Sequence, residues 1–224
     1  MSDRLLINLA ILGGTGKEGQ GLAYRLARAG YPILLGSRTP DKAARVADEL
    51  NQRLGQASVR GMANDEAAGR CHIAILTVPY EAHRPTLEAL KERLTGKVLV
   101  DVTVPLKPPK ITTVYVPPAG SAAQEAQEIL GPTTQVVAAF QNISHEHLVQ
   151  DHPVPCDVLV CGGDDEARMQ VLQLVAAVGL VGWDAGPLQN AVVVEGLSAV
   201  LIGINKRYKM HAAGIRITGE QPPR

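Results

Sequence analysis

Short, continuous apolar runs rich in Val, Ile and Leu alternate along the chain with segments in which apolar residues return every third or fourth position. Such runs are typical of strands buried on both faces of a parallel sheet, and the second spacing is typical of helices. The alternation predicts a doubly wound, mainly parallel α/β sheet. We expect strands at residues 5–12, 33–35, 58–61, 72–79, 98–102 and 135–140 and helices at residues 22–27, 40–54, 64–69, 80–94 and 121–130.

Pro153 and Pro155 mark a boundary in this pattern. Beyond them the pattern predicts strands at residues 158–162 and 181–184, a helix up to residue 178 that Asp164 or Asp165 caps, and a long helix at residues 189–208. The prediction is therefore a first domain of residues 1–150 and a small C-terminal α/β domain of residues 151–224. The last helix is apolar on nearly every side, so we expect it to be buried all round, in part by a second subunit.

A glycine-rich turn with the spacing Gly14-x-Gly16-x-x-Gly19 lies between the first strand and the first helix. In this spacing the first glycine allows a tight turn, the second lets the backbone approach a pyrophosphate, and the third lets the helix pack closely on the strand. The free N–H groups at the helix start would face the phosphates. Because strand, turn, helix and second strand follow in order, the sequence predicts a Rossmann-type dinucleotide site.

The end of the second strand indicates which dinucleotide binds. An acidic residue there usually holds the free ribose 2′-hydroxyl of NAD, about 20 residues beyond the glycines. This chain instead has Ser37 and Arg38, followed by Lys42. Hydroxyl, guanidinium and ammonium groups bind a phosphate, whereas a carboxylate repels it. We therefore predict NADP.

Composition limits the partners and the compartment. The 224 residues include 22 basic and 22 acidic side chains, with one Phe and one Trp, so neither a uniformly basic surface nor an aromatic platform for nucleic acid is expected. The three cysteines have no redox or metal spacing, and no cleavable leader is visible. The longest apolar stretch, residues 191–204, is interrupted by Glu195 and is expected to be too short for a bilayer. These features predict a cytoplasmic protein.

No arrangement of side chains for nucleophilic or metal catalysis is visible. His145, His147 and His152 are close in sequence, but without a nearby Cys or carboxylate pair their spacing is poor for zinc and favours a surface loop. We expect no catalytic residue and no metal ion.

Several motifs together resemble the NADPH-dependent reductases of coenzyme F-420, an 8-hydroxy-5-deazaflavin, over nearly the whole chain. These motifs are residues 12–16 with Gly19 and Gly21, 36–38 with Lys42, 75–79, 160–165, 184–188 with Glu195, 203–208 and 214–217. Many dinucleotide-binding proteins share the first motif, whereas the last two are far more particular. One departure is Gln141, where some members carry His, so this position is not an obligatory acid or base here.

The resemblance implies a homodimer in which NADP binds the Rossmann domain and the C-terminal domain closes a deazaflavin pocket. It implies phosphate contacts from Thr15, Gly16, Lys17 and Glu18, and Gly14 and Gly19 complete this cofactor site through the glycine spacing described above. It also implies 2′-phosphate contacts from Ser37, Arg38 and Lys42. Val78 and Val104 would line the path to the nicotinamide, and Ile143 and Ala213 would lie near the deazaflavin.

Hydride transfer between nicotinamide and deazaflavin would need only that the rings are held face to face, because the reactivity belongs to the cofactors. Two alternatives stay open. One is another small NADP-dependent reductase of an imine or keto acid, which would need a fixed proton donor, and no obvious Lys or Glu is visible for that role. The other is a module that binds NADP(H) without transferring hydride.

A cationic segment near the C-terminus contains Lys206, Arg207 and Arg216 and no acidic residue. Cations at a helix C-terminus are favourable in themselves, which explains the first two. Arg216 lies beyond the predicted helix. The segment is therefore a candidate site for the phosphodiester and glutamate tail of the deazaflavin.

Overall fold

The computed structural model describes residues 7–219, so Leu5 and Leu6 of the first predicted strand lie outside the described residues. The strands are β1 (Leu9–Leu12), β2 (Ile33–Ser37), β3 (Val59–Ala63), β4 (Ile73–Leu76), β5 (Val98–Asp101), β6 (Gln135–Ala138), β7 (Asp157–Gly162) and β8 (Val181–Asp184). The helices are α1 (Lys17–Arg28), α2 (Pro40–Leu54), α3 (Asn64–Arg70), α4 (Tyr80–Leu94), α5 (Ala122–Leu130), α6 (His145–Leu148), α7 (Asp165–Ala177) and α8 (Ala191–Tyr208), with a 3₁₀ turn η2 (Leu188–Asn190) before the last.

Among the described residues, eight strands form one sheet in the order β3-β2-β1-β4-β5-β6-β7-β8. Every neighbouring pair is parallel except β6 and β7, which are antiparallel. The chain starts in the middle of the sheet, builds one half outward through β3 and then returns to β4 to build the other. This is the doubly wound, mainly parallel fold that the sequence predicts.

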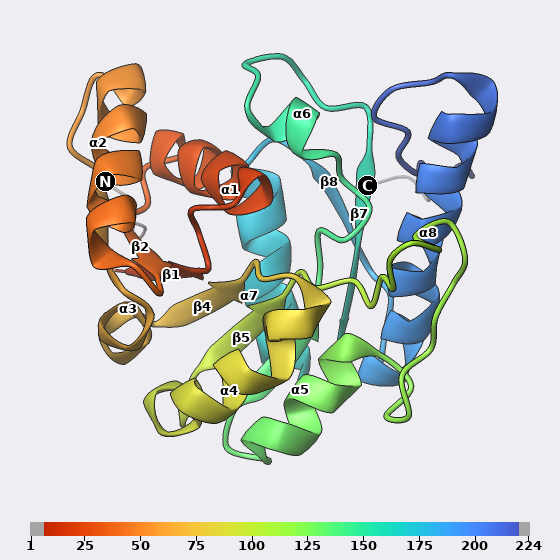
Figure 1. The fold of residues 1–224 in the computed structure, drawn as a ribbon, viewed down its shortest axis with the longest axis horizontal. Coiled ribbons are helices and arrows are strands. Elements are labelled where there is room, and N and C mark those ends of the chain that lie inside the picture. Colours follow the sequence, from red (N-terminus) through yellow and green to blue (C-terminus); the bar gives the residue numbers. More distant parts are fainter. Residues whose placement is uncertain (1–6, 220–224) are drawn as a thin grey trace.

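Two hydrophobic cores lie on the two faces of the sheet. Leu9 and Ile11 of β1 belong to the core under α1, α2 and α7, whereas Ala10 and Leu12 belong to the core under α3, α4 and α5. Successive strand side chains point to opposite faces, and here both faces are covered by helices (Figure 1). This double burial explains why the strands are continuous apolar runs in the sequence.

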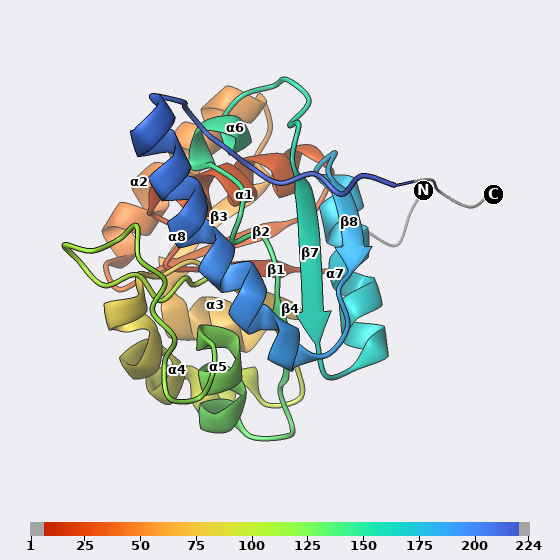
Figure 2. The same ribbon diagram turned by 90° about the vertical axis from the view of Figure 1, so that its right-hand side faces the viewer.

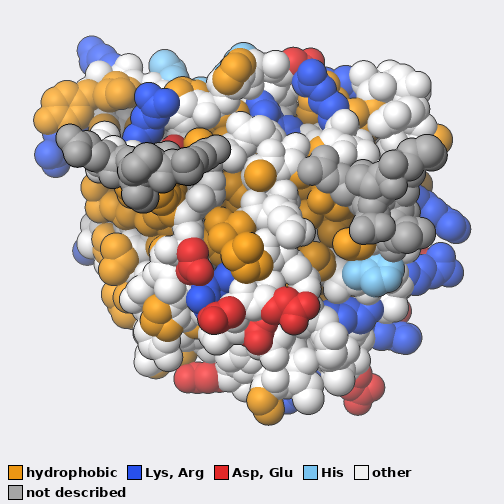
Figure 3. Space-filling model, turned by 180° about the vertical axis from the view of Figure 1, so that it is seen from behind, with side chains coloured by type: hydrophobic (Ala, Val, Ile, Leu, Met, Phe, Trp, Pro, Cys, Tyr) orange, Lys and Arg blue, Asp and Glu red, His pale blue; other side chains and the backbone are white. Residues whose placement is uncertain are grey.

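The helix α8 differs from its prediction. One face is buried, with Val194, Glu195 and Leu201, but Val193 and Val200 are 62% and 45% exposed, so the expectation of burial all round is wrong for the single chain. Figure 3 shows hydrophobic side chains gathered along its left margin, the side on which α8 lies. With η2 the helical segment Leu188–Tyr208 spans 21 residues, and among the described residues it is the one segment whose length and composition alone would suffice to cross a membrane.

Glu195 and a proline-rich segment anchor α8 to the rest of the chain. Both oxygens of Glu195 accept backbone N–H groups at the start of α5, from Ala122 at 2.7 Å and Ala123 at 3.0 Å. The segment of residues 102–121 is irregular, as its prolines predict, and runs beside α8 in both ribbon views (Figures 1 and 2). It packs on Gly196, where an added Cβ would lie 3.3 Å from Val114 Cγ1.

The predicted domain boundary near residue 150 falls in the connection between α6 and β7. Beyond it, β7 pairs with β6 and β8 pairs with β7, so this part of the chain extends the same sheet. The four-residue helix α6, just before the boundary, was not predicted. In α7 the capping prediction is confirmed for Asp164, whose Oδ1 accepts the N–H of Ala167 at 2.7 Å.

Candidate functional site

The turn between β1 and α1 depends on glycines for its packing. Gly13, one position before the residue predicted to make the turn, has the positive φ of 72°. A Cβ on Gly14 would lie 2.5 Å from Leu35 Cδ1, and a Cβ on Gly19 would lie 2.6 Å from Gly14 Cα. Gly14 and Gly19 therefore bring helix and strands together, as the spacing predicts for Gly19. The N–H of Gly13 donates to Asn64 Oδ1 at 3.1 Å.

The start of α1 can receive an anion. The first helical hydrogen bond at the N-terminus runs from Gln20 N to Gly16 O, so the N–H groups of Lys17, Glu18 and Gly19 have no partner within the helix. A Cβ on Gly16 would meet only Gly13 O, at 3.8 Å, which leaves the space above the turn open. Free donors, an open approach and the helix dipole together fit a pyrophosphate.

A cavity of about 310 Å³ lies over this turn, and we call it the turn cavity. Thr15, Gly16, Ser37, Arg38 and Lys42 line it, so the structure brings two of the predicted phosphate residues together with the three predicted 2′-phosphate residues. Neither Arg38 nor Lys42 takes part in an ion pair within residues 7–219, which leaves both charges available to a ligand. The other lining residues are Gly13, Thr39, Asn64, Thr77, Val78, Pro79, Ala82 and Thr86.

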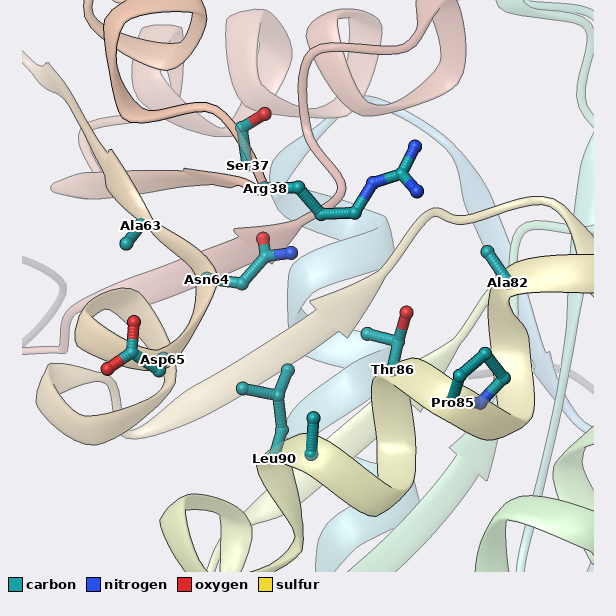
Figure 4. A pocket seen from close by; sticks show the side chains of 10 residues that line it. Ser37, Arg38, Ala63, Asn64, Asp65, Ala82, Pro85, Thr86 and Leu90 are labelled. Carbon is teal, nitrogen blue, oxygen red and sulfur yellow. The ribbon is translucent and has the colours of Figure 1, made fainter.

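A second cavity, of about 330 Å³, continues from Arg38 toward α4 (Figure 4). Arg38 extends between the end of β2 and the Ala82 and Thr86 side of α4, and Leu90 closes the far side of the cavity. Its wall is mainly apolar, and we call it the α4 cavity. Of its lining residues, Ser37 and Arg38 were predicted site residues, and the others were not: Ala63, Asn64, Asp65, Ala82, Pro85, Thr86, Ala89 and Leu90.

A third cavity, of about 350 Å³, lies on the other side of the α1 start, and we call it the far cavity. Val104, Ile143 and Ala213 line it together, although they are far apart in the sequence. Val104 follows β5, Ile143 follows β6 and Ala213 follows α8. Val78 lines the turn cavity instead. The remaining lining residues are Glu18, Leu106, Gln141, Asn142, Ser144, His145, Ser198, Leu201, Ile202 and Asn205.

The predicted tail residues are placed differently. Lys206 and Arg207 are exposed in the last turn of α8, and Arg216 is exposed beside β7, where the neighbouring Ile215 accepts a hydrogen bond from Asp157 N at 2.8 Å. None of the three lines the far cavity, although Asn205 and Ala213 of the same segment do.

Known proteins are similar to this sequence over 95% of the chain. Residues 8–105 match the sequence model of a family described as NADP oxidoreductase, coenzyme F420-dependent. The chain is 42% identical to the F420-dependent NADP reductase of Methanocaldococcus jannaschii, over 95% of this chain and 98% of that protein. The enzyme of that name from Methanothermobacter marburgensis is 40% identical, with the same coverage of both chains. The chain belongs to this family.

A solved structure agrees with the fold. A protein from Arthrobacter sp. FB24, described as an F420-dependent NADP reductase, superposes with a TM-score of 0.81 over 95% of this chain and all of that one. Its identity is 23%, so this likeness concerns the fold alone. The resemblance stated from the sequence motifs and the fold class are both confirmed.

In this member of the family, two buried acceptors in the far cavity have no partner. Glu18 Oε1 and Gln141 Oε1 are the buried side-chain polar atoms without a hydrogen bond among the described residues. Burial raises the pKa of Glu18 to about 8. Gln141 is held in place by its amide, which donates to Asp101 O at 2.8 Å. The motif comparison predicted Glu18 as a phosphate contact. Nothing in the sequence around Glu18 indicated that its carboxyl group lines the far cavity.

A buried polar network supports the carboxyl ends of the strands. His83 Nε2 lies 2.7 Å from Asp101 Oδ2, and His83 Nδ1 lies 3.4 Å from Glu125 Oε1. Burial alone would lower the pKa of His83, but the charges and hydrogen bonds of Asp101 and Glu125 outweigh it and raise the pKa. Tyr80 donates its hydroxyl to Glu125 Oε2 at 3.2 Å. The network joins α4, β5 and α5, and none of these four residues lines the three cavities.

The three histidines near residue 150 do not converge. His145 lines the far cavity, while the rings of His147 and His152 meet edge to face at 5.3 Å. Within residues 7–219 no group of three or more His, Cys, Asp or Glu side chains could hold a metal ion.

Proposed function

We propose that this protein transfers a hydride between NADP(H) and the deazaflavin coenzyme F-420. The observation that carries the proposal is that the turn cavity and the far cavity flank the same helix start, with Thr15 and Gly16 lining one and Glu18 the other. Two bound ring systems can therefore meet beside α1. The relatives at 42% and 40% identity are reductases that use these two compounds.

NADP would lie along the turn and α4 cavities. The N–H groups at the start of α1 would hold the pyrophosphate, and Ser37, Arg38 and Lys42 would hold the 2′-phosphate. The mainly apolar α4 cavity suits the adenine ring.

The nicotinamide would lie where the turn cavity and the far cavity adjoin. Val78 follows β4 and Val104 follows β5, and these neighbouring strands end side by side, with Thr103 Oγ1 3.5 Å from Val78 O. Val78 lines the turn cavity and Val104 the far cavity. A ring between the two valines would therefore face both sites.

The far cavity would hold the deazaflavin, with Ile143 and Ala213 against its ring. Residues 151–224, proposed as a small C-terminal domain, contribute one wall through α8 and Ala213. We assign no residue as catalytic. When bound, the two cofactors supply the hydride donor and acceptor, and the side chains supply orientation and exclude water.

Lys206, Arg207 and Arg216 would attract the anionic tail of the coenzyme from outside the cavity. Replacing all three with neutral residues is expected to raise the KM for F-420 several-fold at low salt and to leave NADPH binding nearly unchanged. The effect should shrink in high salt, because exposed charges are then screened. An unchanged KM at low salt would mean that these cations do not bind the tail and that Lys206 and Arg207 only stabilise the end of the helix.

We further propose a cytoplasmic homodimer. Val193 and Val200 form an exposed apolar strip on α8, and Val114, which packs on Gly196 between them, is also exposed. A second copy would cover this strip. Light scattering should give twice the chain mass of 23.8 kDa.

One observation favours a second candidate. Glu18 places in the far cavity a carboxyl group that a reductase of imines or keto acids could use as a proton donor. Parallel assays, one with NADPH and oxidised F-420 and one with NADPH and an imine or keto acid, separate the functions. Loss of deazaflavin absorbance supports the proposal, turnover of an imine or keto acid alone supports the second candidate, and NADPH binding without turnover supports a non-enzymatic module.

A further inference from the structure

The polar atoms of the far cavity divide into those with partners and those without. Asn142 Nδ2 donates to Val194 O at 2.9 Å and to Ser198 Oγ at 3.1 Å, and Ser198 Oγ donates to Gln141 O at 2.7 Å. These groups fix the wall and are engaged with each other. Glu18 Oε1 and Gln141 Oε1 remain, both buried and both lining the cavity.

A buried acceptor without a hydrogen bond is costly, so two in one wall indicate a ligand that brings donors. The rest of the wall adds Val104, Leu106, Ile143, Leu201 and Ile202, which suit a flat apolar ring. The pyrimidinedione end of a deazaflavin offers such a donor, an imide N–H that stands between two carbonyl groups.

We propose that Glu18 recognises this imide edge as a neutral carboxyl group, donating one hydrogen bond to a ring carbonyl and accepting another from the ring N–H. A carboxylate could accept from the N–H but would repel the adjacent carbonyl oxygens. The side chain of Glu18 thus binds substrate in the far cavity, whereas its backbone N–H stays with the phosphate site at the start of α1. The inference rests on the proposed function.

The surroundings of Glu18 keep its carboxyl neutral. Burial is the cause of its raised pKa, with no charged partner contributing. The proline-rich segment contributes Val104 and Leu106 to the wall, and the α8 residues of the wall are all uncharged. The other titratable side chain in the wall is that of His145 of α6, and the adjacent residue on α1, Lys17, is exposed.

The test uses a ring probe, the 8-hydroxy-5-deazaflavin without the anionic tail, and the same probe methylated at the imide nitrogen. Both are titrated spectroscopically, without NADPH, into the parent and the variants Glu18→Leu and Glu18→Gln. Glu49→Gln, on the exposed side of α2, is the matched control for loss of one carboxylate. Matching circular dichroism spectra and equal NADPH affinity confirm that the variants are folded.

We expect Glu18→Leu to weaken the unmethylated probe by about tenfold or more, since a bond to a buried partner is lost. Glu18→Gln should restore most of that loss, because an amide also donates and accepts. Methylation should weaken binding to the parent much more than to Glu18→Leu. Affinity of the parent should fall from pH 7 to 9, beyond the change seen with Glu18→Gln, which reports the titration of the probe itself.

Equal discrimination against the methylated probe by parent and Glu18→Leu would overturn the assignment. So would a loss of kcat of a hundredfold or more in Glu18→Gln with probe binding intact, because that marks a proton donor. If the parent neither binds the probe nor oxidises NADPH with F-420, the proposed function fails. If the parent binds the probe and oxidises NADPH with F-420, and Glu18→Leu binds the probe with the same affinity, the proposed function stands and this inference alone fails.

Discussion

Arg38 and Lys42 are two cations beside the turn cavity without an ion-pair partner among the described residues. If Arg38 binds the 2′-phosphate, Arg38→Ala should weaken NADPH binding by about tenfold to a hundredfold, the value of one charge-assisted hydrogen bond. NADH binding, measured by the same titration, should change little. Arg45→Ala, an exposed arginine on the same helix as Lys42, is the control. Equal weakening of both cofactors would rule out this role.

Two carboxyl groups with raised pKa values make the free energy of unfolding depend on pH. Burial raises the pKa of Glu18 and of Glu195 to about 8, from an ordinary value of 4.5. Between those values the unfolded chain has released protons that the folded chain keeps, so the free energy of unfolding falls as pH rises. The raised pKa of His83 acts in the same direction, because its contribution is lost as pH rises through that pKa.

We therefore expect the melting temperature to decrease from pH 4.5 to 8, and to decrease less in Glu18→Gln. Each kcal/mol corresponds to about 2–4 °C in a chain of this size. Calorimetry across this range measures the difference. Parallel curves for parent and variant would mean that Glu18 titrates near its ordinary value.

At the scale of elements, Arg25 ties α1 to the loop that shapes the far cavity. Its guanidinium donates to five backbone carbonyls, those of His147, Leu148, Gln150, His152 and Val178. Arg25→Ala should destabilise the protein by about 2–4 kcal/mol, speed hydrogen exchange in residues 145–152 and raise the KM for F-420. NADPH binding should be unaffected.

The neighbouring Arg28 is a matched control for Arg25. It is exposed and makes one ion pair, with Asp151, so Arg28→Ala should cost about 0–1 kcal/mol. A loop that exchanges equally fast in both variants would contradict the role given to Arg25.

Most elements could be predicted because each has a strong local signal. Pro40 and Tyr80 begin helices at the predicted residues, since prolines and apolar periodicity mark them. The helix α6 has only four residues, too few for a period, and was missed. The open face of α8 could not be predicted, because apolar composition does not say which chain covers it.

The parts of the site that could be predicted are those in which a short sequence motif determines the local backbone conformation. Gly16, Ser37 and Arg38 lie together as their spacing indicates. The network of His83, Asp101 and Glu125 joins distant parts of the chain, and its only signal was a charged residue at the end of an apolar run. The direction of the Glu18 side chain depends on packing around α1, which no spacing encodes.

At the scale of the whole molecule, the fold gathers its cavities around the carboxyl ends of β1, β2, β4, β5 and β6. This is the edge at which open α/β sheets bind ligands. The α8 segment then returns from β8 past α5 and supplies one wall of the far cavity. The C-terminal part of the chain thereby brings a second site against the dinucleotide site.

The central claim is direct transfer between two rings held beside α1. It is tested most directly with NADPH carrying deuterium at carbon 4 in either the R or the S position, in ordinary water with oxidised F-420. The account predicts that one of the two positions delivers its deuterium to carbon 5 of the deazaflavin, without loss to solvent, because each ring is bound on one fixed face. Reduced F-420 without deuterium from either labelled NADPH, or no reduction while NADPH binds, would contradict it.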